Sequence, residues 1–175
     1  MSRNRSVLHC AALAFGLLIT ADSASAQSNF PIRNRASGLV ADVVGAQTND
    51  GQPVILFKKN GNPNQLFFQA VETDDTFSLV AVHSSKCLDV AGFSQLDGAD
   101  VIQFACHRGT NQRWTVQHIG GGIILKSVNS GKCLDARNGK FPRPPGSGAP
   151  LQQWACILRA SDPNAVNQIF TLGSF

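Results

Sequence analysis

The sequence predicts an all-β fold built from three repeated four-strand units. Two observations carry this prediction. The chain aligns with itself at a fixed spacing, and such a repeat constrains the architecture before any single residue is interpreted. Short runs rich in β-branched and aromatic residues also alternate with turn signals, whereas no segment after residue 26 keeps an apolar pattern of helical period.

The repeat becomes visible when the chain is shifted by 47 residues, the difference between positions 42 and 89. Asp42 then falls on Asp89, and the pair Asn64-Gln65 falls on Asn111-Gln112, without gaps. A third copy carries extra residues around 138–147 and 157–164, which are rich in Pro, Gly or polar residues and are read as loop insertions. The copies span about 29–75, 76–121 and 122–175.

Four short strands are expected in each copy. In the second copy they are Phe77–Val82, Cys87–Val90, Val101–Phe104 and Gln112–Val116. One such unit cannot close a core, but three units around a pseudo-threefold axis can close a barrel and remove exposed strand edges. A three-bladed propeller has the same repeat count and is the alternative, although propellers seldom have so few blades.

The N-terminus has the layout of a secretory signal. Arg3 and Arg5 precede an apolar run from Val7 to Ile19, and Ala24-Ser25-Ala26 forms a small-residue cleavage site. Residues 1–26 are therefore expected to be removed, leaving one domain over 27–175 in a secreted or periplasmic protein. No later stretch approaches the roughly 20 apolar residues of a membrane helix, so no membrane span is expected.

Charge gives little indication of a partner. Cleavage would remove Arg3, Arg5 and Asp22, which changes 15 basic and 11 acidic residues to 13 and 10 and the net charge from +4 to +3. Basic pairs such as Lys58-Lys59 are more often a solvated face than a binding site, and nucleic acid is not an expected partner.

Cys10 lies in the signal segment, so four of the five cysteines remain in the mature chain, an even number that favours two disulfides in an exported protein. Matching repeat positions predict the pairs Cys87–Cys106 and Cys133–Cys156, while the first copy has Val40 and Lys59 instead. Zinc sites usually contain closely spaced ligand pairs, and the sequence has none, so neither a metal nor a cofactor is expected.

The repeated unit resembles the ricin B-type lectin β-trefoil, whose subdomains end in Gln-x-Trp. Each cysteine-containing copy has Cys-Leu-Asp, then a run ending in an aromatic residue, any residue and Cys, and each copy closes with Asn-Gln-x-aromatic. Gln112-Arg113-Trp114 is the strongest match, whereas Phe replaces Trp in Gln65-Leu66-Phe67 and in the final motif. The resemblance covers nearly the whole mature chain and implies a β-trefoil that binds glycans or glycoconjugates, with galactose-type sugars.

The same resemblance implies which residues bind sugar, because a sugar needs an aromatic platform, an acidic acceptor and amide groups. The third copy is the most complete, and its candidates are Asp135, Gln152, Trp154, Asn167 and Gln168. Those of the second copy are Asp89, Phe104, Asn111 and Gln112, and those of the first are Asp42, Phe57, Asn64 and Gln65. The glutamines could instead satisfy buried backbone groups, and the aspartates could bond only a turn amide. Trp114, Phe67 and Phe170 are expected in the core.

The sequence does not predict an enzyme. It contains no nucleophile elbow, zinc-protease motif or phosphate loop. A glycosidase would need a pair of carboxylates, whereas the repeat places one in each copy. A non-catalytic lectin is therefore predicted. Two alternatives remain: the glycan-binding delivery subunit of a toxin with a separate catalytic chain, and a trefoil protease inhibitor that offers the loop Phe141–Pro145.

Overall fold

The computed structural model describes residues 28–72, 74–139 and 142–173, so the expected signal segment lies outside the described residues. The described residues form twelve strands and no α-helix, which confirms the all-β prediction. The strands are β1 Ile32–Asn34, β2 Val40–Val43, β3 Gln52–Phe57, β4 Phe67–Val71, β5 Phe77–Ala81, β6 Cys87–Val90, β7 Val101–Phe104, β8 Trp114–Ile119, β9 Gly122–Ser127, β10 Cys133–Ala136, β11 Leu151–Trp154 and β12 Phe170–Leu172.

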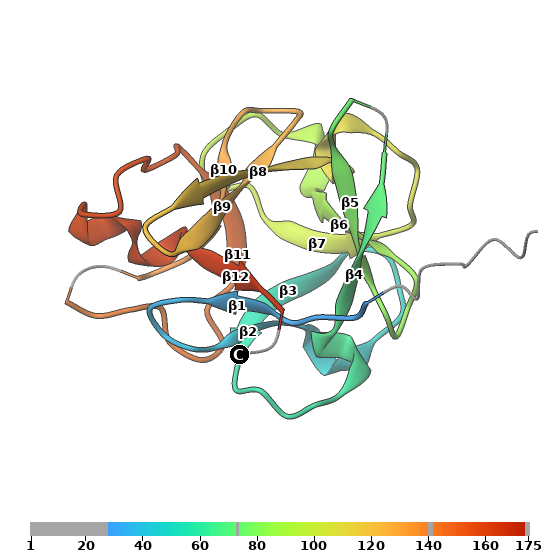
Figure 1. Ribbon diagram of the computed structural model, residues 1–175. Coiled ribbons are helices and arrows are strands. Elements are labelled where there is room, and N and C mark those ends of the chain that lie inside the picture. Colours follow the sequence, from blue (N-terminus) through green and yellow to red (C-terminus); the bar gives the residue numbers. More distant parts are fainter. Residues whose placement is uncertain (1–27, 73, 140–141, 174–175) are drawn as a thin grey trace, which may run out of the picture.

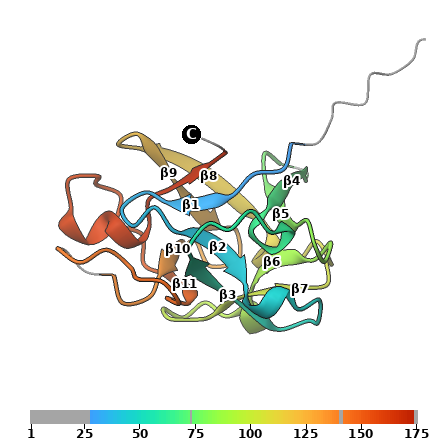
Figure 2. The same ribbon diagram turned by 90° about the horizontal axis from the view of Figure 1, so that it is seen from below.

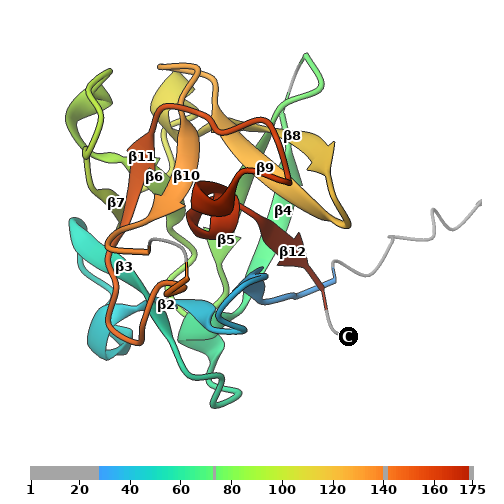
Figure 3. The ribbon, with the colours of Figure 1, turned by 90° about the vertical axis from the view of Figure 1, so that its left-hand side faces the viewer.

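Six of these strands close a barrel. The ring of antiparallel pairs runs β1, β12, β9, β8, β5 and β4, and the bridge between Phe30 and Phe67 returns it to the start. The first strand, β1, therefore lies beside the last, β12 (Figure 1 and Figure 3). Closure leaves the barrel without exposed strand edges.

The other six strands form three hairpins, β2–β3, β6–β7 and β10–β11, one in each copy. Figure 2 shows the molecule from below, with β2, β3, β10 and β11 near one another. The barrel and its three hairpins together are a β-trefoil, as the sequence predicted, and the propeller alternative is wrong.

The core lies along the pseudo-threefold axis and is filled by equivalent residues of the three copies. Phe67, Trp114 and Phe170 are each at most 1% exposed and begin the strand that follows the closing Gln of their copy. The Trp114 indole Nε1–H also donates to Leu88 O at 3.3 Å. These three rings are core residues, as expected.

The hairpins of the second and third copies are each joined by one disulfide to the loop that follows them. These disulfides are the predicted pairs Cys87–Cys106 and Cys133–Cys156. In the first copy the buried Val40 packs without a crosslink, and Lys59 is exposed. Cross-linking loops of about 20 residues is worth roughly 3 kcal/mol each in the chain-entropy model.

The fourth strand of the second copy begins later than the sequence suggested. The predicted strand Gln112–Val116 is wrong at its start, because Thr110–Gln112 form the short 3-10 helix η4 and β8 begins at Trp114. A matching 3-10 helix, η2, covers Pro63–Gln65 in the first copy, and η5 covers Pro163–Asn167 in the third. These turns direct the side chains of the closing Asn and Gln inward together, whereas in a strand the two side chains would point to opposite faces.

Glutamines fix the junctions between neighbouring hairpins. Gln103 Nε2 donates to Gln47 O at 2.7 Å and to Asn49 O at 2.9 Å, so the second copy holds a loop of the first. Gln153 does the same to Ser94 O and Leu96 O, both at 2.9 Å. At the third junction the equivalent residue is Leu56, and only backbone hydrogen bonds with Gly148 and Ala149 are found among the described residues.

We expect Gln103→Leu to lower the free energy of unfolding by about 1–3 kcal/mol, because two carbonyl groups of the neighbouring loop lose their donor and Ser84 Oγ loses its acceptor. Leucine is a suitable replacement, since Leu56 is fully buried at the same place in the first copy. Denaturant unfolding measures the effect, with Gln52→Leu, a partly exposed position on β3, as the control. Equal unfolding midpoints for Gln103→Leu and the parent protein would contradict this account of the junction.

Candidate functional site

Each copy brings a buried carboxylate next to an exposed aromatic ring. Asp42, Asp89 and Asp135 are the third residues of β2, β6 and β10, and all three are buried. The last residues of the paired strands are Phe57, Phe104 and Trp154, with exposed fractions of 42%, 38% and 44%. Such exposed rings beside a buried charge form three separate candidate sites, one on each hairpin.

The closing glutamine lies beneath each site and uses its whole amide group in the protein. In the first copy, Gln65 Nε2 donates to Asp42 Oδ2 at 2.7 Å and to Lys58 O at 3.0 Å, and its Oε1 accepts from Asn60 N at 2.8 Å. Gln112 and Gln168 make the same three types of bond. These glutamines therefore position the carboxylate and have no remaining donor for a ligand.

The closing asparagine, unlike the glutamine, uses only the donor side of its amide group toward other described residues. Asn64 Nδ2 donates to Asp42 Oδ1 and Val43 O, both at 3.0 Å, and Asn111 Nδ2 donates to Asp89 Oδ2 and Val90 O at 2.9 and 3.1 Å. The Oδ1 atoms of Asn64, Asn111 and Asn167 are buried and accept no hydrogen bond from the described residues. A buried acceptor without a donor is costly, and these three oxygens are the unsatisfied polar atoms that the sites have in common.

The first-copy site is the wider of two described hollows at these positions. It has a volume of about 440 Å³ and is lined by Asp42, Phe57, Asn64 and the two further amides of Asn60 and Asn62. The predicted set of the first copy is therefore brought together, except that Gln65 lies below the lining.

The second-copy site is narrower, with a volume of about 210 Å³, and contains two aromatic groups that the sequence analysis missed. Phe93 and His107 line it together with Asp89, Phe104 and Asn111. His107 Nδ1 accepts from Gly109 N at 3.0 Å, so a neutral ring carries its proton on Nε2, which lies 3.5 Å from Asp89 Oδ2. His107 aligns in the repeat with Asn60, which lines the first-copy hollow, and this alignment could have identified His107 as a site residue.

Gln152 links the carboxylate of the third copy to an arginine. Gln152 Nε2 donates to Asp135 Oδ1 at 2.8 Å, while Arg137 Nε donates to Gln152 Oε1 at 2.9 Å. Asp135 Oδ2 also accepts from Gln168. The structure thus joins Asp135, Gln152 and Gln168 directly, with Trp154 exposed at the end of the same strand.

Asn167 approaches the third-copy loop closely. A Cβ atom at Gly139 would lie 2.0 Å from Asn167 Oδ1, so only glycine fits there. The next two residues of this loop, Lys140 and Phe141, lie outside the described residues, so the candidate inhibitory loop Phe141–Pro145 is described only from Pro142.

Burial changes the acidity of two of the carboxylates. Desolvation raises the pKa of Asp135 above its ordinary value of 3.8, against the opposing effect of hydrogen bonds from Gln152, Gln168 and Asn167. Desolvation likewise raises the pKa of Asp89, opposed by Gln112, Asn111 and His107. Each carboxylate therefore meets a ligand in a setting where charge is poorly solvated and a hydrogen-bond donor is valuable.

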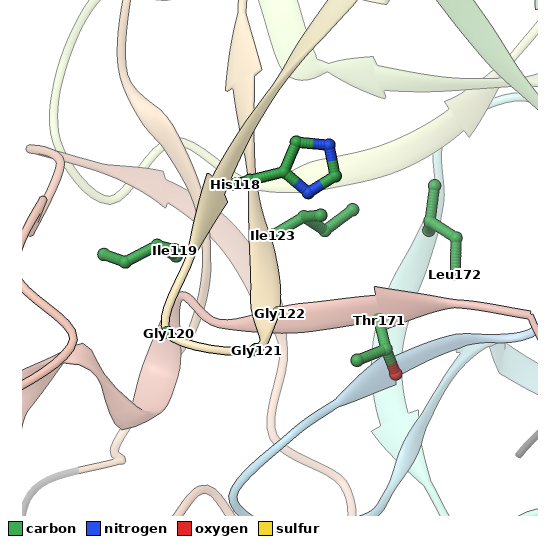
Figure 4. A pocket seen from close by; sticks show the side chains of 8 residues that line it. All are labelled: His118, Ile119, Gly120, Gly121, Gly122, Ile123, Thr171 and Leu172. Carbon is green, nitrogen blue, oxygen red and sulfur yellow. The ribbon is translucent and has the colours of Figure 1, made fainter.

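A further hollow lies at the β8–β9 hairpin, away from the three sites. It has a volume of about 410 Å³ and is lined by residues of β8, β9 and β12, including His118, Thr171 and the glycines 120–122 (Figure 4). None of the predicted binding residues lines it. Among the described residues, no three His, Cys, Asp or Glu side chains are grouped to hold a metal ion.

Three copies of an acceptor carboxylate, an asparagine and an exposed ring on a β-trefoil define a carbohydrate-binding protein, a lectin. The chain belongs to the ricin-type β-trefoil lectin family, whose domain profile matches residues 28–170. Members of this family generally bind carbohydrate and do not catalyse a reaction.

Known proteins of this type are similar in sequence and in structure. The seed lectin of Trichosanthes anguina is 34% identical over 84 residues, 44% of this chain and 15% of that protein. The designed threefold-symmetric protein ThreeFoil superposes with a TM-score of 0.75 at 34% identity, covering 84% of this chain and 99% of its own. The exo-β-1,3-galactanase 1,3Gal43A of Clostridium thermocellum superposes with a TM-score of 0.75 at 26% identity, covering 87% of this chain and 31% of the enzyme.

The two tryptophans provide a matched test of core and platform. Trp114 is fully buried, so Trp114→Ala should lower the free energy of unfolding by about 3–5 kcal/mol. Trp154→Ala should cost much less, because 44% of that side chain is already exposed, and should weaken sugar binding at the third site. Thermal melting and binding to immobilised sugar measure both effects. Equal losses of stability would place Trp154 in the core.

Sugar binding should weaken on acidification at a pH above 3.8, because protonation removes the charge of Asp89 and Asp135 as the pH falls through their raised pKa values. Stability should change in the opposite direction. The pKa of each aspartate is higher in the folded state than in the unfolded state, so between these two values the folded state binds more protons. The free energy of unfolding therefore falls as the pH rises through the folded-state pKa. The variant Asp42→Asn, which removes the first site, allows sugar binding and melting temperature to be measured against pH for the other two sites. Binding that stays constant down to pH 3.8 would contradict the prediction.

Proposed function

We propose that this protein is an exported, non-catalytic lectin that binds galactose-type glycans through more than one of its three sites. The observation that carries the proposal is the repeated site itself. In each copy a buried aspartate, held by amide donors, lies beside an asparagine oxygen that lacks a donor and a ring that faces solvent.

The groups of each site suit the two chemistries of a sugar. Phe57, Phe104 and Trp154 offer flat apolar faces for the C–H face of a pyranose ring. The aspartate oxygens accept hydrogen bonds from sugar hydroxyls, and a bond to a carboxylate is about twice as strong as a neutral one. Asp89 is well suited to this role, since its Oδ1 receives no hydrogen bond from the described residues.

The preference for galactose-type sugars is supported by family membership and by the likeness to a galactanase. Export is supported by the two disulfides and by the signal layout of residues 1–26. No helix among the described residues is both long enough and apolar enough to span a membrane.

A partner chain remains a second proposal. The matched part is only 15% of the seed lectin and 31% of the galactanase, so related domains occur within larger proteins. Delivery of a toxin or enzyme chain to glycans would use the same three sites. Co-purification of a second polypeptide with the native protein would support that role.

Sugar at high density on a bead should bind about 10²- to 10⁴-fold more tightly than the free monosaccharide, whose single-site affinity should be roughly millimolar. Asp89→Asn and Asp135→Asn should each weaken their own site by about 1.5–3 kcal/mol, because the neutral amide loses charge-assisted strength. The triple variant with Asp42→Asn should lose bead binding. Melting temperatures serve as the folding control, and undiminished bead binding by a folded triple variant would refute the proposed sites.

A further inference from the structure

Phe93 stands in an unusual backbone conformation at the rim of the second-copy site. It ends the short 3-10 helix Ala91–Phe93 with a φ of 52°, a left-handed value that bulky residues rarely adopt. Its side chain is 51% exposed, so burial of the ring does not explain the choice. The equivalent residue of the first copy, Ala46, has the same φ, so the turn imposes this backbone conformation, and it is the exposed ring in a binding pocket that points to a role in binding.

The rim that carries Phe93 is held from outside the second copy. Asn129, in the turn between β9 and β10, donates from Nδ2 to Phe93 O at 2.9 Å and to Ser94 O at 3.2 Å. Its Oδ1 accepts from Thr110 Oγ1 at 3.1 Å, at the start of the helix that carries Asn111. One side chain therefore fixes the aromatic rim relative to the asparagine acceptor.

The ring of Phe93 is also supported from within the site. It stacks on His107 with ring centroids 5.6 Å apart and an interplanar angle of 23°. His107 in turn meets Phe104 edge to face at 6.2 Å. The three rings form a continuous wall, with Ile102 as a further apolar group, around the two acceptors Asp89 and Asn111.

The first copy lacks this wall among the described residues. Ala46 takes the equivalent place in the first copy with the same φ of 52°, and the residue there that aligns with His107 is Asn60. The first-copy hollow is about 440 Å³ and bordered by three asparagines, whereas that of the second copy is about 210 Å³ and mainly apolar. A hydroxyl group that faces Phe93 would find no partner, but a methyl group would be buried.

We propose that Phe93 is a specificity-determining residue that makes the second-copy site prefer sugars with an apolar substituent, such as the acetamido methyl of N-acetylgalactosamine, over galactose. This inference rests on the proposed lectin function. The first-copy site, with its amide lining, is expected to show no such preference.

The test isolates the second site in the variant Asp42→Asn/Asp135→Asn and measures its dissociation constants for galactose and N-acetylgalactosamine by calorimetry. The acetylated sugar should bind about fourfold more tightly, the factor that burial of one methyl group supports. Phe93→Ala in this background should bring the ratio near one. The replacement should fold, because Ala46 already occupies the equivalent backbone conformation.

The converse substitution, Ala46→Phe with Asp89→Asn and Asp135→Asn, should raise the preference of the first site for the acetylated sugar. An unchanged ratio in Phe93→Ala overturns the role of Phe93. Absence of sugar binding by the isolated second site overturns both that role and the assignment of this site. Binding of the parent protein to galactose beads separates these failures from failure of the lectin function itself.

Discussion

The hydrogen bond between the closing glutamine and the hairpin aspartate is the interaction on which the three sites depend. It joins β2 to η2, β6 to η4, and β10 to the residue after η5, so that a residue late in each copy is fixed to one near its start. The carboxylate is thereby kept under the surface in a defined orientation. The asparagine beside the glutamine and the ring at the hairpin end then lie on either side of it, and in the first two copies they line one hollow with it.

The same framework carries three different surfaces, because the residues around the aspartate are not repeated. The first copy surrounds Asp42 with amides, the second surrounds Asp89 with rings, and the third links Asp135 through Gln152 to Arg137. Internal repetition therefore preserves the acceptor and the fold while the neighbouring positions vary. Such a molecule can present different preferences on one rigid body.

Much of the fold followed from the sequence because its signals are local or repeated. Strand runs, turn residues and matched cysteines predicted the trefoil and both disulfides, and the core place of Trp114 followed from its closing motif. The aromatic rim was missed because Phe93 and His107 are 14 residues apart and meet only through the turn and loop geometry. The bond between Arg137 and Gln152 was missed for the same reason, as a partner across a hairpin depends on register.

The unequal junctions between hairpins bear on how many sites a partly opened molecule would present. Gln103 and Gln153 tie the second copy to the first and the third to the second, whereas Leu56 offers no side-chain donor where the third copy meets the first. The ends of the chain, β1 and β12, lie in these same two copies. Within the barrel, however, Asn34 Nδ2 donates to Val166 O at 2.9 Å across the same boundary. A molecule opened between the third and the first hairpin would therefore stay joined at the barrel, and it would keep all three sites on one body while the distance between two of them could adapt to the glycans on a surface.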